Sequence, residues 1–198
     1  MYPLVETIKI INGKPQNLEW HQKRYNYSHM TIFGRPPEII LEDVIKVPVN
    51  FRSGVVKCRF LYNTDSFTAE FQNYIKREIN SLKIVVDNNI EYGHKFTDRS
   101  SIKNLLDRKG DCEDILIIKD GKVTDTSFSN IVFYDGRGWY TPSSPLLKGT
   151  ARERLLKTGK ILSRDITRDD LKLFSGCRLI NSMLDFEEQR MFVISGIK

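Results

Sequence analysis

One lysine lies where its side-chain amine could do chemistry. Lys95, in the segment HKFTDR, follows a loop that contains Gly93 and precedes a predicted helix. An amine attacks a carbonyl carbon only when deprotonated, so burial or a cationic neighbour must lower its pKa. Arg99 is the candidate neighbour, and Lys103 is a competing amine expected on the solvent face of the helix. A lysine at such a boundary is most often a solvated surface residue. Its position one strand-helix-strand unit before an unusually polar segment favours Lys95.

That polar segment joins two apolar strands, and a simple hairpin core would need none of its side chains. They are Thr124, Asp125, Thr126, Ser127, Ser129 and Asn130. Asp125 is either a turn residue that bonds its own backbone or a carboxylate paired with a protonated ring nitrogen, which keeps the ring electron-withdrawing. The segment therefore predicts a site for a polar ligand.

Two further features suit an anion. Gly149, Thr150 and Ala151 open a predicted helix, whose unpaired amides and dipole favour a phosphate. Arg24, on an earlier predicted helix, offers a bidentate donor. A glycine before a helix is common, and Arg24 alone would pass for a surface charge. Together these residues predict a phosphorylated cofactor.

The elements that must position these residues follow from periodicity and turn signals. Asp120-Gly121 and Asp135-Gly136 predict turns between strands, and Gly34 predicts a helix end. Asn17, and Asp98 or Ser100, are predicted side-chain N-caps. The predicted strands are 3–11, 55–62, 67–74, 82–86, 115–118, 131–134, 161–166, 177–182 and 191–197, and the predicted helices are 18–33, 41–46, 98–109, 150–157 and 168–174.

Composition narrows the class of protein. The 198 residues are 40% apolar and carry a net charge of +6. Basic residues are interleaved with acidic ones, which argues against nucleic acid as a partner. The apolar runs are shorter than the roughly 20 residues of a membrane helix, so we expect no membrane association. Cys58, Cys112 and Cys177 have no metal-binding spacing, and we expect buried thiols in a cytoplasmic protein without a metal.

Four segments, in this order, resemble the fold-type IV pyridoxal phosphate (PLP) enzymes, the class IV aminotransferases with 4-amino-4-deoxychorismate lyase. They are VETIKIINGKPQNLEWHQKR, KFTDR, DGKVTDTSFSNIVF and TPSSPLLKGTAR, and the resemblance covers almost the whole chain. It implies an α+β fold like that of D-amino acid aminotransferase. A small N-terminal α/β domain would span residues 1–87 and a larger β-rich domain residues 88–198, with the cofactor in the cleft between them. It also implies a homodimer.

The resemblance assigns roles to residues from the first helix to the polar segment. Lys95 matches the lysine that binds PLP covalently and moves the α-proton of the substrate. Arg24, in an H-x-x-R pattern, matches the phosphate-binding arginine. Asp125 stands where the family has a glutamate facing the pyridine nitrogen, and Asn130 is expected to be structural in the same motif.

At the phosphate end, Gly149 precedes Thr150 and Ala151, which match the two residues whose backbone amides hold the phosphate. Ser182, in LINSM, resembles a residue near the phosphate and substrate. We expect Arg59, on the predicted strand 55–62, to bind the carboxylate of an amino-acid-like substrate.

This chain departs from the family pattern at three places. Asp125 is one methylene shorter than glutamate, Ala151 replaces a threonine hydroxyl, and the segment before Lys95, which holds much of the family's substrate specificity, is short. The resemblance favours pyruvate elimination from 4-amino-4-deoxychorismate to give 4-aminobenzoate, a folate precursor, since the lyases are the shorter members. A class IV aminotransferase acting on branched-chain or D-amino acids is the alternative. A non-catalytic binding protein that keeps the fold is the third.

Overall fold

A computed structural model describes residues 2–198, and its contacts divide the chain into two compact units. Unit 1 comprises the chain up to Lys76 together with His94–Asp98, and unit 2 comprises Arg77–Gly93 and Arg99–Lys198. The expected domain boundary at residues 87 and 88 differs from this division, because residues 77–93 pack with the second unit and residues 94–98 with the first. The fold is α+β, as expected from the sequence.

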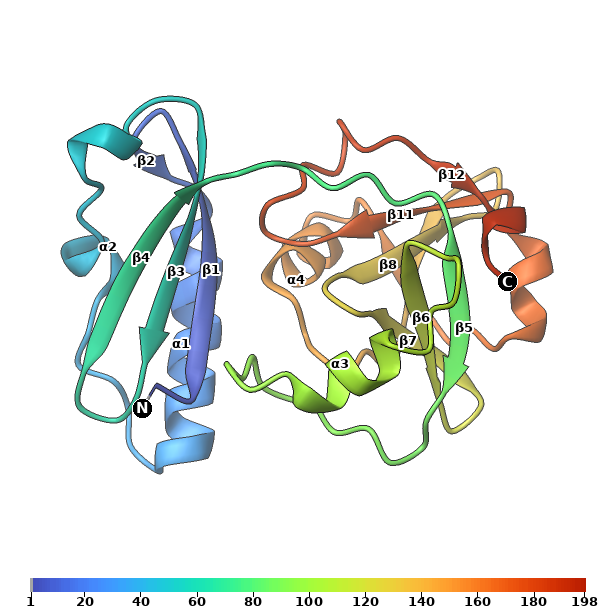
Figure 1. Ribbon diagram of the computed structural model, residues 1–198, viewed down its shortest axis with the longest axis horizontal. Helices are drawn as coiled ribbons and strands as arrows, with labels where there is room; N and C mark the ends of the chain where they lie inside the picture. The colour runs from blue at the N-terminus through green and yellow to red at the C-terminus, as the bar shows by residue number, and fades with distance from the viewer. Residues whose placement is uncertain (1) are drawn as a thin grey trace. The chain divides into compact units, whose positions relative to one another are not determined.

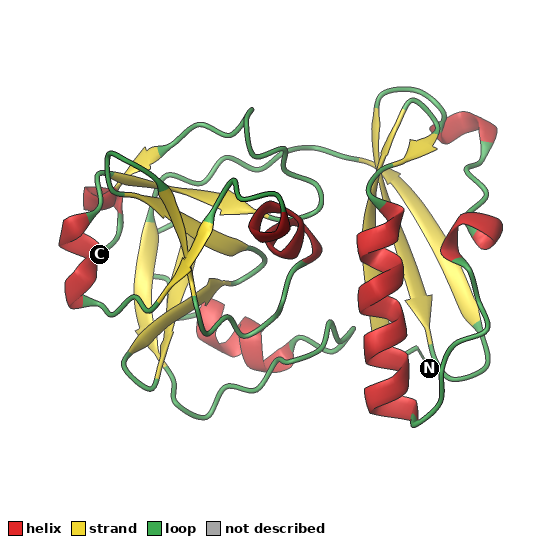
Figure 2. Ribbon diagram, turned by 180° about the vertical axis from the view of Figure 1, so that it is seen from behind, coloured by secondary structure: helices red, strands yellow, loops and turns green. Residues whose placement is uncertain are grey.

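Unit 1 is one antiparallel sheet with a long helix along one face (Figures 1 and 2). The strand order is β2-β1-β3-β4. Its elements are β1 (Leu4–Ile11), β2 (Lys14–Pro15), α1 (Leu18–Phe33), α2 (Leu41–Val44), the 3₁₀ turn η1 (Val49–Phe51), β3 (Val55–Tyr62) and β4 (Phe67–Asn73).

Alternation along β1 and β3 explains why the sheet binds α1. Successive side chains of a strand point to opposite faces, so every second residue of β3 from Val56 to Tyr62 is buried. These residues pack with Leu4, Ile8 and Tyr25 in one apolar cluster. The core of unit 1 therefore lies between the sheet and α1.

The two ends of α1 differ in how they match prediction. Gly34 has φ 73° and donates its N–H to the Met30 carbonyl at 3.0 Å, which confirms the predicted helix end. Asn17 precedes the helix, but it has φ 55° and makes no side-chain cap hydrogen bond. Asn17 is the N-cap residue as predicted, but its predicted side-chain bond is not made, because its left-handed backbone is not the extended one from which such a side chain reaches the first-turn amides.

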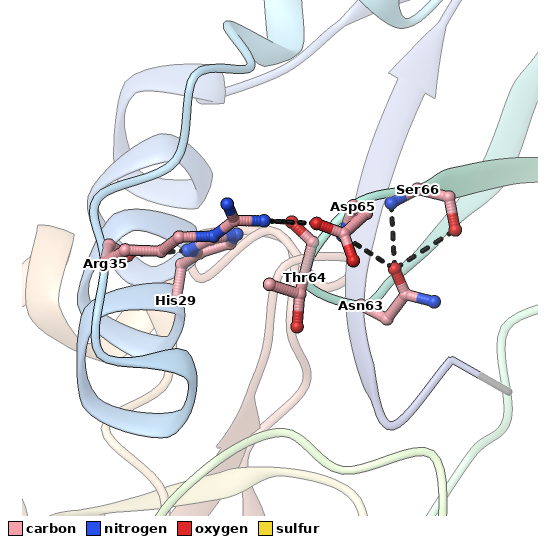
Figure 3. Close-up of polar contacts among 6 residues, drawn as sticks. All are labelled: His29, Arg35, Asn63, Thr64, Asp65 and Ser66. Carbon is pink, nitrogen blue, oxygen red and sulfur yellow. Dashed lines mark hydrogen bonds and ion pairs between the residues drawn. The ribbon is translucent and has the colours of Figure 1, made fainter.

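The loop after α1 is tied to the turn between β3 and β4 (Figure 3). Asn63 Oδ1 accepts from the backbone amides of Asp65 and Ser66 at 2.9 and 2.8 Å. The Arg35 guanidinium pairs with the Asp65 carboxylate, and His29 Nδ1 donates to the Arg35 carbonyl at 2.7 Å. The end of the helix and the tip of the hairpin thus hold each other.

Unit 2 contains two sheets, of strand order β5-β6-β7 and β10-β9-β8-β11-β12. Their inner faces and the neighbouring turns form a cluster around residues such as Leu116, Ile131 and Phe133. The elements are β5 (Leu82–Val86), α3 (Ser100–Leu106), β6 (Asp114–Lys119), β7 (Lys122–Thr126), β8 (Asn130–Tyr134), β9 (Trp139–Pro142), α4 (Thr150–Lys157), β10 (Leu162–Arg164), η2 (Asp169–Leu173), β11 (Gly176–Ile180), β12 (Phe192–Val193) and η3 (Ile194–Gly196).

The turn chemistry of unit 2 follows the sequence closely. Asp120 and Gly121 have φ 50° and 75°, and they join β6 to β7 as an antiparallel hairpin, as predicted. Gly136, with φ 92°, lies in the turn between β8 and β9. The N-cap residue of α3 is Arg99 and makes no side-chain cap bond, so the predicted Asp98 or Ser100 cap is wrong.

The three cysteines are buried and free, as expected. Within residues 2–198, no helix is long and apolar enough to cross a membrane.

Candidate active site residues in two units

In unit 1, a carboxylate from β1 is buried against one face of α1. Glu6 Oε1 and Oε2 accept from Nε and Nη2 of Arg24 at 2.8 and 2.6 Å. Glu6 Oε2 also lies 2.6 Å from Nδ1 of His21. His21 and Arg24 stand three residues apart on the helix, a spacing that places both on the same face. The H-x-x-R pattern therefore supplies two side chains, His21 and Arg24, that bind the same carboxylate of β1.

The charges in this cluster settle its protonation. Burial alone would raise the pKa of Glu6, but the Arg24 charge and the hydrogen bonds from His21 and Arg24 outweigh it and lower that pKa to about 2. Burial lowers the pKa of His21, against the opposing effect of Glu6. At neutral pH the cluster thus holds an ionised Glu6, a neutral His21 that donates Nδ1–H, and a charged Arg24.

Lys95 belongs to unit 1 because its segment pairs with the edge of β1. The Lys95 carbonyl accepts from the Val5 N–H at 3.0 Å, and Leu4 and Phe96 form an antiparallel bridge. The charge of Lys95 is the last of the causes that lower the pKa of His21, after burial and the charge of Arg24. Lys95 and Arg24 therefore belong to the same unit, and both charges act on the buried His21. Arg99, the expected neighbour of Lys95, instead donates to a carbonyl in unit 2, that of Ser127.

In unit 2, Asp125 lies buried at the polar join between β7 and β8. Its Oδ1 accepts from Nδ2 of Asn130 at 2.6 Å, and its Oδ2 accepts from the N–H of Leu147 at 2.9 Å. Burial raises the pKa of Asp125 to about 6, although these two bonds and the charge of Arg152 oppose the rise. Near pH 7 the carboxyl is mostly ionised and can face a cation.

Hydroxyl groups of the polar join make hydrogen bonds within unit 2. Thr124 Oγ1 donates to the Ile117 carbonyl at 2.9 Å, and Thr126 Oγ1 donates to the Ser129 carbonyl at 3.2 Å. These bonds satisfy buried hydroxyl groups within unit 2, so part of the polarity that drew attention in the sequence serves the fold.

The first turn of α4 lies directly after the loop that Asp125 holds. Gly149 is the N-cap residue of this helix, and the amides of Thr150 and Ala151 belong to its first turn, where no acceptor exists within the helix. Sequence reasoning missed Arg152, which is buried and donates Nη2–H to the Pro142 carbonyl at 2.9 Å. Its charge opposes the rise in the pKa of Asp125. Nothing in the sequence distinguished Arg152 from the other basic residues of this helix.

Ser182 and Arg59 occupy different settings. Ser182 follows β11 and adjoins Asn181, whose Nδ2 donates to Ser129 Oγ at 2.8 Å. Arg59 pairs with Glu70 across β3 and β4, with Nη1 2.7 Å from Oε2. Arg59 is opposite Thr7 and therefore on the sheet face that points away from Glu6. Its expected role in binding the substrate carboxylate stays a prediction.

The predicted residues thus form two groups, each described within its own unit. Arg24, Lys95 and Arg59 lie in unit 1, and Asp125, Gly149, Thr150, Ala151 and Ser182 lie in unit 2. Across residues 2–198 no cluster of three or more His, Cys, Asp or Glu side chains could hold a metal ion.

Comparison with known proteins gives matches over most of the chain. The family model described as amino-transferase class IV matches residues 3–186. An uncharacterized protein of Haemophilus influenzae is 40% identical over 185 residues, which cover 92% of this chain and 98% of that protein.

Solved structures of similar proteins match the fold of this chain. The crystal structure of a candidate 4-amino-4-deoxychorismate lyase from Haemophilus somnus is 35% identical, with a TM-score of 0.85, covering 92% of this chain and 97% of that one. A hypothetical aminotransferase of Mycobacterium tuberculosis in its PLP-bound form has a TM-score of 0.78 over 96% of this chain and 80% of that one, and its 18% identity supports the fold alone.

Proposed function

This chain belongs to the class IV aminotransferase family, and from that membership we propose that it is a PLP-dependent enzyme that eliminates pyruvate from 4-amino-4-deoxychorismate. The observation that carries the choice of reaction is the 35% identity, over 97% of its length, to the candidate lyase of H. somnus. The alternative within the family is transamination of branched-chain or D-amino acids.

The donor set of the chain fits the cofactor. PLP carries an aldehyde, a phosphate and a pyridine nitrogen. Unit 1 supplies a primary amine in Lys95 and a guanidinium in Arg24, and unit 2 supplies a buried carboxylate in Asp125 and the first-turn amides of α4. A guanidinium has five donors in a planar fork, so Arg24 can bind Glu6 and also face a phosphate. These are the kinds of donor that the aldehyde, the phosphate and the pyridine nitrogen of PLP require.

The chain's own residues would then do three jobs. When bound, the pyridine ring supplies an electron sink for the carbanion at the substrate α-carbon. Lys95 would hold the cofactor at Nζ, and the same atom would act as the base that moves the α-proton of the substrate. Asp125, ionised near neutral pH, favours a protonated ring nitrogen opposite it. Arg24 and the amides of Thr150 and Ala151 anchor the phosphate, which fixes the orientation of the ring.

Covalent trapping tests the cofactor assignment. Protein incubated with PLP and reduced with borohydride should carry the cofactor on Lys95, as located by peptide mass spectrometry. The Lys95→Ala variant should not be labelled, whereas the Lys103→Ala variant, changed at an exposed lysine of α3, should be labelled like the wild type. A protein that never takes up PLP would be the non-catalytic member of the fold.

Product analysis separates the two reactions. With 4-amino-4-deoxychorismate as substrate, we expect pyruvate and 4-aminobenzoate without any requirement for a keto acid. Amino transfer that depends on a keto acid, with no pyruvate released, would identify the aminotransferase instead. Light scattering of the same sample tests the expected homodimer.

A further inference from the structure

A closed ring of hydrogen bonds holds the loop before α4. Asn130 Nδ2 donates to Asp125 Oδ1 at 2.6 Å and to the Leu147 carbonyl at 2.8 Å. The N–H of Leu147 donates to Asp125 Oδ2 at 2.9 Å. We call these three residues the loop latch. Because Asp125 lies on β7 and Asn130 opens β8, the latch fastens the loop to two strands of unit 2.

Gly149 meets the same amide from the other side. Its φ is −68°, a value that any residue adopts, so backbone conformation does not require a glycine here. A Cβ at this position would lie 2.1 Å from Asn130 Oδ1. Asn130 therefore occupies the space that a side chain at position 149 would need. Its Nδ2 holds the loop by hydrogen bonds, and its Oδ1 contacts the loop at Gly149.

Two of the three latch residues are buried. Asp125 and Asn130 are 5% and 6% exposed. The bond to the carboxylate is charge-assisted, and such bonds are stronger than those between neutral groups. Only one residue, Lys148, separates the latched Leu147 from Gly149, the N-cap of α4. The latch therefore determines where the amides of Thr150 and Ala151 stand.

We propose that Asn130 is a positioning residue for the phosphate of the cofactor. It acts through the loop latch, which sets the first-turn amides of α4, and it does not contact the phosphate itself. This inference rests on the proposed function, because the phosphate is that of PLP. It gives Asp125 a second role, since both of its oxygens bind latch partners at the same time as the carboxylate faces the ring.

A pair of ligands isolates the phosphate contribution. Apo protein is titrated with PLP and with pyridoxal, which lacks the phosphate, and the change in absorbance gives both dissociation constants. In Asn130→Asp, an acceptor replaces the donor that faces Asp125. We expect about tenfold weaker PLP binding, since loss of one charge-assisted bond is of this order. Pyridoxal binding should weaken less, because only the change at Asp125 affects it. Asn104→Asp, at an exposed position of α3, is the matched control and should leave both constants unchanged.

A double-mutant cycle tests the contact with Gly149. Gly149→Ala should weaken PLP binding in the wild-type background, because the new methyl group collides with Asn130. In an Asn130→Ala background the same change should cost much less, since the colliding atom is gone. Additive effects of the two substitutions would overturn the proposal.

Amide exchange provides a measurement that needs no variant to fold. In the wild type, the N–H of Leu147 should exchange slowly with solvent deuterium, and fast exchange would overturn the latch. Equal weakening of PLP and pyridoxal by Asn130→Asp would show a purely structural role and overturn the inference while leaving the enzyme assignment intact. Failure of the wild type to bind either ligand would instead remove the proposed function, and with it the phosphate role, even if Leu147 were protected.

Discussion

Replacing Glu6 by glutamine keeps the shape of the side chain and removes its charge. Glu6 is 1% exposed, and its carboxylate is bound by two donors of Arg24 and one nitrogen of His21. A glutamine would keep one acceptor oxygen, but its NH₂ group would face donors. The substitution therefore removes the negative charge that faces a guanidinium inside unit 1.

The expected loss of unfolding free energy is about 3 kcal/mol at neutral pH. Removing one partner of a buried ion pair costs about 3–5 kcal/mol, and the Arg24 side chain is only 11% exposed. Lowering the pKa of Glu6 from 4.5 to about 2 corresponds to about 3 kcal/mol. Because the folded-state pKa is depressed, this stabilisation is fully present above pH 4.5 and disappears as the pH falls to about 2.

Urea unfolding followed by tryptophan fluorescence measures this loss. A Trp139→Phe background leaves Trp20 on α1 as the reporter of unit 1. The deficit of Glu6→Gln should shrink to less than half between pH 7 and pH 3. Glu70→Gln, which removes an exposed partner of Arg59, should cost at most about 1 kcal/mol. A deficit that is the same at pH 3 and pH 7 would refute the electrostatic reasoning and assign the loss to packing.

Further outcomes follow from burial and charge. Asp114→Asn should raise the melting temperature at pH 7 and not at pH 3, because burial raises the pKa of Asp114, and the penalty for its charged form grows as the pH rises above 3.8. Ile8→Ala should cost about 2–5 kcal/mol of unfolding free energy, whereas Val49→Ala, at an 80% exposed position, should change it by about 0.5 kcal/mol or less. If Arg59 binds the substrate carboxylate, Arg59→Gln should raise KM about tenfold at unchanged kcat, and Glu70→Gln, which breaks the same ion pair, should not.

Much of the fold was readable from the sequence because local signals and burial agreed. The periodicity of residues 18–33, ended by Gly34, gives α1 with its observed bounds, and residues 150–157 likewise give α4. Asp120-Gly121 fixes the β6–β7 hairpin since both residues accept positive φ. Such short-range features depend on a few neighbouring residues, which the sequence displays directly.

What the sequence could not display were contacts between distant segments. Glu6 was visible only as a polar residue among aliphatic ones, and its role depends on the face of a helix that begins twelve residues later. Lys95 was expected with the C-terminal domain, yet it pairs with β1. Asn17 is the N-cap residue of α1, but with its left-handed backbone it does not make the predicted side-chain bond.

The pairing of Lys95 with Val5 also bears on how the protein is made. The two residues are about ninety positions apart, so this pairing closes a long loop, and long loops close late because their entropy cost must be met by contacts already formed. On the ribosome, β1, α1, β3 and β4 emerge before the segment that carries the lysine. The sheet of unit 1 can therefore assemble first, and residues 94–98 can pair with the edge of β1 only later. A nascent chain stalled short of this segment would contain the Glu6–Arg24 pair but not Lys95.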